Sequence, residues 1–141
     1  MQNFAQKINI RLARFAIFVV YFWFGALKVF TESPANPLVS ALLDKTLPGV
    51  PFEIFIIFFG IFEMVIGILF LIPKAEKLAI LLFCVHFVMI IMPLLILPQT
   101  TWQGFLTPTL EGQYIIKNIL LLSVVVSIWA NLGLGRNTKN V

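Results

Sequence analysis

The sequence has few charged side chains and almost no cysteine or histidine. Only 11% of its 141 residues are charged, whereas an average soluble domain has about 25%. The one cysteine, Cys84, excludes a disulfide and a Cys-x-x-Cys redox pair within the chain. The one histidine, His86, excludes a bis-histidine haem site within a monomer. Because His86 follows Cys84 by two positions on a helix, the two side chains point to different faces and cannot bind one metal ion together. We therefore expect no metal, haem or disulfide.

A basic stripe interleaved with aromatic residues is also missing outside the apolar segments. The formal net charge of +4 therefore gives no support to nucleic-acid binding. What the chain has instead is apolar sequence, with 60% hydrophobic residues and a mean hydropathy of +1.01. Four apolar runs are each long enough to cross a hydrocarbon core of roughly 30 Å at roughly 1.5 Å per residue. This composition is typical of a multi-pass membrane protein.

The apolar runs predict an all-α integral membrane protein, with one domain over residues 1–141 folded as an antiparallel bundle of four transmembrane helices. These helices are expected at about residues 11–30, 51–72, 78–97 and 111–132. Pro93 is expected to kink the third. Between the first and second, an amphipathic segment at about residues 37–47 is enclosed by proline and glycine, which predicts a short interfacial helix. That helix is either a lid over the mouth of the bundle or a simple connector.

The distribution of lysine and arginine predicts the orientation in the membrane. In the loops on one side of the four predicted helices only Lys45 is basic. The other side has seven basic residues: Lys7, Arg11, Arg14, Lys74, Lys77, Arg136 and Lys139. By the positive-inside rule, both termini and the loop between the second and third helices are cytoplasmic. We therefore expect a multi-pass protein of the cell inner (plasma) membrane.

Glu63 is the most informative single residue because it lies near the middle of the second helix. A carboxyl at that depth costs roughly 2.5–3.5 kcal/mol on insertion scales, which makes it a functional-site candidate. Gly60 and Gly67 share its helix face and allow a neighbouring helix to approach closely, so this face should look inward. Counted from the cytoplasmic ends of their helices, Glu63 and His86 lie in nearly the same layer. We predict that they are in contact, either as an ion pair or as two neutral groups that share a hydrogen bond.

A second polar layer is expected nearer the outer face. Lys28 ends the first helix, on the same stripe as Tyr21, and either faces inward or simply extends its ammonium to the interface. Tyr114, Lys117 and Asn118 lie in the first turns of the fourth helix. Lys117 is too deep for an ordinary positive-inside residue, so it needs either a polar ligand or a carboxylate partner. The candidate carboxylates are Glu53, Glu63 and Glu111.

Three segments share their pattern with a known family. They are GALKVF at the end of the first helix, GIFEMVIGILFLIPK in the second, and TLEGQYIIKNILLL at the start of the fourth. Together they resemble the DoxX-like family of small four-helix membrane proteins, most closely its YkgB/RclC-like branch. The resemblance implies a left-handed four-helix bundle with inward polar positions at Lys28, Glu63 and Lys117. It also implies a link to redox and quinone biology. Some relatives are subunits of quinone-reducing sulfur oxidoreductases, others act in oxidative-stress responses, and a distant vertebrate branch assists receptor assembly in the endoplasmic reticulum.

The polar residues within the helices could together hold an isoprenoid quinone or a similar polar-headed lipid. A quinone head needs hydrogen-bond donors at its carbonyls and an apolar, partly aromatic cavity. The candidate ligand-binding residues are Lys28, Glu63, His86, Lys117, Tyr21, Tyr114 and Asn118. No residue is assigned a catalytic role.

Two functions are consistent with this site. In the first, the chain is at most a quinone-binding subunit of a membrane oxidoreductase, because no flavin, metal or thiol centre is visible and electrons would have to come from a protein partner. In the second, it is a non-catalytic assembly or chaperone-like protein. The buried charges then specify helix packing or capture the transmembrane segment of a client.

Overall fold

The computed structural model describes residues 4–30 and 32–137, and helices dominate this part of the chain. Four stretches within it are long and apolar enough to cross a membrane. The chain is therefore a multi-pass membrane protein. The four stretches are Gln6–Phe30, Phe52–Leu71, Pro73–Ile96 and Leu110–Leu132. Lys139, which contributes to the predicted orientation, lies outside the described residues.

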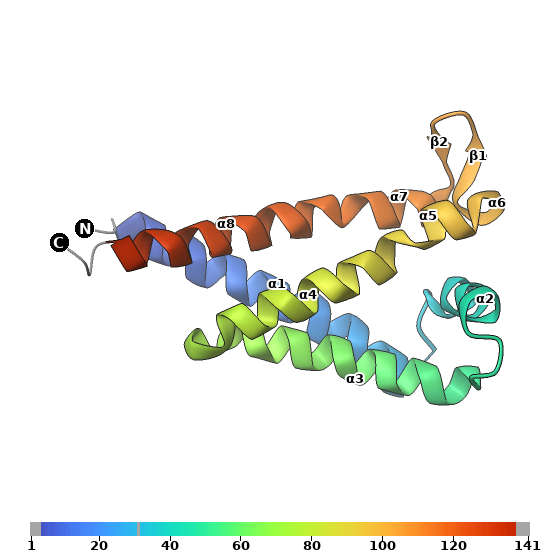
Figure 1. The fold of residues 1–141 in the computed structure, drawn as a ribbon, viewed down its shortest axis with the longest axis horizontal. Coiled ribbons are helices and arrows are strands. Elements are labelled where there is room, and N and C mark those ends of the chain that lie inside the picture. Colours follow the sequence, from blue (N-terminus) through green and yellow to red (C-terminus); the bar gives the residue numbers. More distant parts are fainter. Residues whose placement is uncertain (1–3, 31, 138–141) are drawn as a thin grey trace.

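The first two stretches are single helices. The first is α1 (Phe4–Phe30) and the second is α3 (Phe52–Leu71). α1 starts before the predicted position at about residue 11. Its first turns contain several good helix formers, among them Gln6, Lys7 and Arg11, and Phe4, Ile8 and Leu12 continue its apolar pattern at helical spacing. α1 and α3 lie against each other, and they form the most closely packed helix pair of the molecule (Figure 1).

Glycine allows this close packing. A Cβ atom placed on Gly25 would lie 2.5 Å from the carbonyl oxygen of Gly60, and one placed on Gly60 would lie 2.7 Å from the carbonyl oxygen of Gly25. Gly67 makes a looser contact of the same kind, 3.2 Å from the carbonyl oxygen of Phe18. The expectation that Gly60 and Gly67 allow a neighbouring helix to approach is confirmed.

The third stretch bends at proline, as predicted. It contains the 3-10 turn η1 (Pro73–Ala75), α4 (Glu76–Ile91) and α5 (Pro93–Ile96). Pro93 has no backbone N–H to continue the ladder of α4, so the helix is interrupted at Met92. Figure 1 shows the change of direction between α4 and α5.

The fourth stretch follows a short hairpin that the sequence analysis described only as a polar loop. After α6 (Pro98–Thr101), strand β1 (Trp102–Gly104) pairs with β2 (Thr107–Pro108). The chain then enters α7 (Leu110–Lys117) and α8 (Ile119–Asn137), which are nearly collinear in Figure 1.

Helix α2 (Asn36–Thr46) connects α1 to α3 and contacts α3 and α5. Its only buried residue is Leu43, as befits a short amphipathic helix with one apolar side. Figure 1 shows α2 and the β1–β2 hairpin at one end of the molecule and the start of α1 with the end of α8 at the other.

The core is a compact apolar layer. Along α1, it lies between Tyr21 and the start of the helix. Outside it, many large apolar side chains are exposed, which suits hydrocarbon as the surrounding solvent. The buried cluster consists of Ile17, Tyr21, Ile66, Phe70, Ala79, Phe83, Val125 and Ile128. Tyr21 is its only polar member and lies where the apolar core ends and the polar site begins.

Candidate functional site

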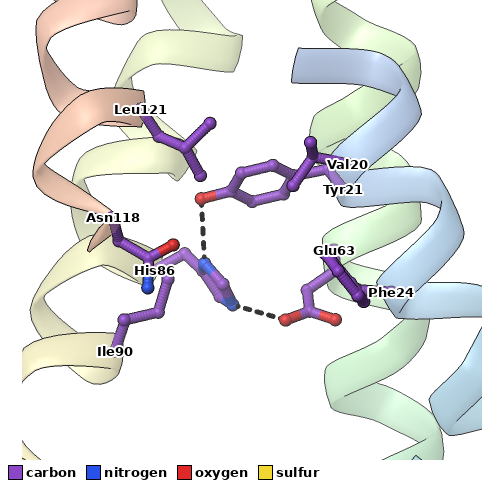
Figure 2. Close-up of a pocket in the computed structure, with 8 residues that line it drawn as sticks. All are labelled: Val20, Tyr21, Phe24, Glu63, His86, Ile90, Asn118 and Leu121. Atoms are coloured by element: carbon purple, nitrogen blue, oxygen red, sulfur yellow. Dashed lines mark hydrogen bonds and ion pairs between the residues drawn. The ribbon is translucent and has the colours of Figure 1, made fainter. Parts of the chain in front are cut away.

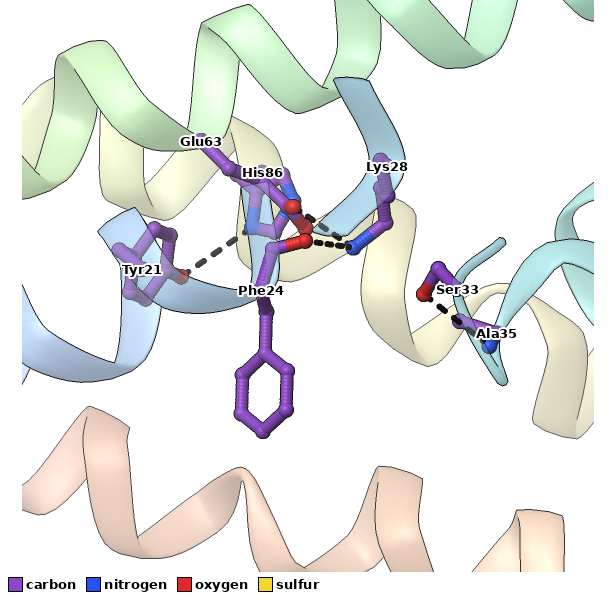
Figure 3. Close-up of polar contacts among 7 residues, drawn as sticks. All are labelled: Tyr21, Phe24, Lys28, Ser33, Ala35, Glu63 and His86. Carbon is purple, nitrogen blue, oxygen red and sulfur yellow. Dashed lines mark hydrogen bonds and ion pairs between the residues drawn. The ribbon is translucent and has the colours of Figure 1, made fainter. Parts of the chain in front are cut away.

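Four buried polar side chains form a continuous hydrogen-bonded chain across α1, α3 and α4. The hydroxyl of Tyr21 lies 3.1 Å from Nδ1 of His86, and Nε2 of His86 lies 3.0 Å from Oε1 of Glu63. The Nζ atom of Lys28 donates to Oε2 of Glu63 at 2.7 Å. All four residues are at most 7% exposed. The predicted contact between Glu63 and His86 is confirmed (Figure 3).

A protonation pattern without net charge satisfies every bond in this polar chain. We assign the Tyr21 hydroxyl as donor to Nδ1 of His86, and the N–H at Nε2 of His86 as donor to Glu63. Glu63 is then a carboxylate that accepts from both the imidazole and the Lys28 ammonium. With a neutral imidazole, the chain has no net charge. A neutral, fully bonded group is the least costly arrangement of polar side chains in the interior of a membrane protein.

The helix spacing explains why these residues meet. Tyr21 and Lys28 are seven residues apart, so they share one face of α1, with Gly25 between them. Glu63 lies one turn after Gly60 on α3. Because the backbones touch at Gly25 and Gly60, the Lys28 and Glu63 side chains next to this contact can pair directly.

Aromatic rings surround the polar chain and shield it. The ring centroid of His86 lies 5.1 Å from that of Phe59, 5.9 Å from Phe62 and 5.2 Å from Tyr21. The Nζ atom of Lys28 lies 5.8 Å from the centroid of Phe59 and also donates to the carbonyl oxygen of Phe24 at 3.4 Å. Phe59 therefore contacts both the cationic Lys28 and the imidazole of His86.

A small cavity of about 50 Å³ borders the Tyr21–His86–Glu63 part of the chain (Figure 2). By volume it holds a few water molecules. Apolar and polar side chains from α1, α3, α4 and the α7–α8 junction surround it. They are Val20, Tyr21, Phe24, Glu63, His86, Ile90, Asn118 and Leu121.

The structure brings five of the seven predicted ligand-binding residues to the polar chain or its cavity, and it leaves two outside. Asn118 lines the cavity, and its amide donates to the carbonyl oxygen of Tyr114 at 3.1 Å. Tyr114 is 59% exposed, and Lys117 is also exposed, with its Nζ 5.0 Å from the Tyr114 ring centroid. Within residues 4–30 and 32–137, Lys117 forms no ion pair. Lys28 is the partner of Glu63 instead.

The rotation of the fourth stretch accounts for this difference. Its inward face follows Gly112, Ile115 and Asn118, at helical spacing. Lys117 is one position earlier than Asn118, so it is turned by about 100° to the outside. Counting residues along a helix gave the depth of Lys117 but not the direction of its side chain.

The sequence analysis counted Arg14 only among the basic residues of the side predicted to be cytoplasmic, whereas the structure gives it specific partners. Its Nε donates to the carbonyl oxygen of Phe70 at 2.6 Å, and its Nη1 pairs with Glu76. Arg14 thereby ties α1 to the end of α3 and the start of α4. Its position seven residues before Tyr21, on the stripe that also contains Lys28, was the available signal.

Comparisons with known proteins do not identify the chain. No family model, curated protein or solved structure matches it. The resemblance to the DoxX-like family therefore stays a prediction from sequence motifs, and the family of this chain is open.

Proposed function

We propose that this protein binds the polar head of a membrane-dissolved ligand, an isoprenoid quinone or a lipid of similar shape, beside the Tyr21–His86–Glu63–Lys28 chain. The supporting observation is that four buried polar side chains are bonded in series within the membrane-spanning part of the molecule, and three of them, Tyr21, His86 and Glu63, line a cavity. Polar groups at such depth are costly and commonly mark a binding site or a proton path. In this proposal the four spans form an antiparallel bundle in the inner membrane, with both termini cytoplasmic and α2 at the interface.

The ligand would enter from the side, between α1 and α8. The cavity of about 50 Å³ is much smaller than ligand pockets of roughly 300–1,000 Å³, so binding requires it to widen. Phe24 lines the cavity, is 51% exposed, and points away from the polar chain in Figure 3. The fourth span has the lowest buried share of the four, 17%. A turn of Phe24 and a small shift of α8 would open the cavity towards the lipid.

The residues suit hydrogen bonding to a carbonyl oxygen and proton exchange with it. Asn118 presents an amide at the cavity wall, and the Tyr21 hydroxyl would turn from His86 to donate to a ligand carbonyl. His86 and Glu63 connect that wall to Lys28. Conversion of a quinone to a quinol takes up electrons and protons in equal number. Electrons would come from an electron-donating protein partner, and the buried chain would hold the protons.

The proposal is tested by extracting the purified protein with organic solvent and measuring bound quinone by mass spectrometry and redox-difference absorbance. The test variants are Glu63→Gln and Lys28→Met, which remove the central ion pair. The matched control is Lys117→Met, because Lys117 is exposed and outside the polar chain. We expect near-stoichiometric quinone in the wild type and the control, and a loss of at least tenfold in both test variants while they remain folded.

The opposite outcome favours the second candidate function. If wild-type protein contains no quinone and the variants are only less stable, the polar chain specifies helix packing, and the ligand proposal is wrong. The protein would then be examined as a non-catalytic assembly partner, by comparing the membrane proteins that co-purify with wild type and with Glu63→Gln.

A further inference from the structure

The β1–β2 hairpin presents two large apolar side chains at its tip. Phe105 is 95% exposed and Leu106 is 75% exposed, the former being the highest value among the large hydrophobic residues described. Leu106 also has a φ of 53°, in the left-handed region that leucine rarely adopts. A glycine or asparagine would occupy this turn position more easily, so a bulky apolar side chain there needs an explanation other than turn formation.

The hairpin is held rigidly at its base. Thr109 donates through its hydroxyl to the carbonyl oxygen of Thr100 at 2.7 Å and through its backbone N–H to that of Thr101 at 2.9 Å. The indole N–H of Trp102 donates to the carbonyl oxygen of Leu94 at 3.0 Å. Since the base is bonded to both α5 and α6, the direction of the tip is fixed by the fold.

That direction is sideways from the helices. Figure 1 shows the hairpin leaving the molecule across its long axis, beside the start of α7, and not continuing along that axis. In a protein whose long helices cross a membrane, a loop along the axis would reach into water, whereas a sideways one lies over or within the adjoining lipid.

Charge favours lipid over water as the surroundings of the tip. Residues 78–110, which include the whole hairpin, contain no aspartate, glutamate, lysine or arginine. Trp102 at its base is a residue type typical of the membrane–water interface.

From these observations we propose that Phe105 and Leu106 insert into the interfacial region of the lipid leaflet on the α2 side of the membrane. The hairpin is then a lipid anchor that fixes the depth of α7 and of the fourth span. This interaction surface is independent of the quinone site, and its test does not depend on ligand binding.

The test places an environment-sensitive nitrobenzoxadiazole label at the tip. Phe105→Cys is labelled in a Cys84→Ala background and reconstituted into vesicles of phosphatidylcholine and phosphatidylglycerol. The matched control is Gly49→Cys, an exposed turn position at the same end of the molecule where an added Cβ meets nothing within 4 Å. Both substitutions are at exposed positions, so neither disturbs a packed region.

The first quencher is a lipid with a nitroxide near its headgroup. We expect it to quench the label at Phe105→Cys at least threefold more strongly than the label at Gly49→Cys. Aqueous iodide should quench the two labels in the reverse order. If iodide quenches the tip label as strongly as the control label, and the nitroxide lipid does not quench the tip label more strongly than the control label, the tip lies in water and the proposal is wrong.

Discussion

At the scale of single residues, the hydroxyl of Tyr21 is the point where the polar chain meets both the apolar core and the cavity. It is the only hydrogen-bond partner that the described structure gives to Nδ1 of His86. Loss of one hydroxyl would therefore leave a buried imidazole nitrogen unbonded, while the packing of the ring stays nearly the same. Removal of a single oxygen atom therefore measures the contribution of the hydrogen bond to stability, without a change in the shape of the site.

Tyr21→Phe is predicted to lower the free energy of unfolding by about 1 kcal/mol, since this is a typical value for one buried hydrogen bond. The measurement is unfolding in mixed micelles titrated with sodium dodecyl sulfate. Tyr114→Phe is the matched control, because Tyr114 is 59% exposed, and such surface changes stay within roughly 0.5 kcal/mol. Equal effects of the two variants would show that the Tyr21–His86 bond contributes nothing.

At the scale of helices, the contact between α1 and α3 determines whether the polar chain can form. The backbones meet at Gly25 and Gly60, and Lys28 and Glu63 pair beside that point. Any side chain at the contact must push the two helices apart.

Gly25→Ala is predicted to destabilise the protein by roughly 1–3 kcal/mol through overpacking, since its Cβ would lie 2.5 Å from a backbone oxygen that cannot move alone. Gly49→Ala is the control, with no atom within 4 Å of its Cβ. Thermal unfolding in detergent, followed by circular dichroism, gives the comparison. An unchanged midpoint for Gly25→Ala would mean that α1 and α3 are not in backbone contact.

The helices also show how far the sequence could predict the site. Depth along each helix follows from counting residues, so the Glu63–His86 layer and the bend at Pro93 were predictable. Rotation of the fourth span about its axis was not, because it is set by contacts distant in the sequence. Gly112 packs against the carbonyl oxygen of Thr101, and this contact contributes to turning Asn118 inward and Lys117 outward. The hairpin was missed because its strands are too short for an alternating pattern.

At the scale of the whole molecule, both the quinone proposal and the lipid anchor depend on how the chain lies in the membrane. Within the described structure, the start of α1, the end of α8 and the α3–α4 turn lie at one end (Figure 1). That end has most of the basic residues, which predicts the cytoplasmic side.

This orientation predicts how cysteine probes react in intact cells. In a Cys84→Ala background, Gly49→Cys should react with a membrane-impermeant maleimide added from outside, because it lies in the turn between α2 and α3. Lys74→Cys, in the turn before α4, should react only after lysis. The reverse pattern would show that the protein is inserted the other way, with the termini outside.

The spacing along α1 has a consequence for how the sequence can change in evolution. Arg14, Tyr21 and Lys28 follow one another at intervals of seven residues, and each contacts a partner on α3 or α4. One residue inserted or deleted within this interval would turn one end of α1 by about 100° relative to the other, so that at least one of the three would lose its partner. Many lipid-facing side chains of α1 can be exchanged freely, but its length between Arg14 and Lys28 cannot vary. Homologues that retain the site should therefore differ in α1 by substitution and not by insertion or deletion.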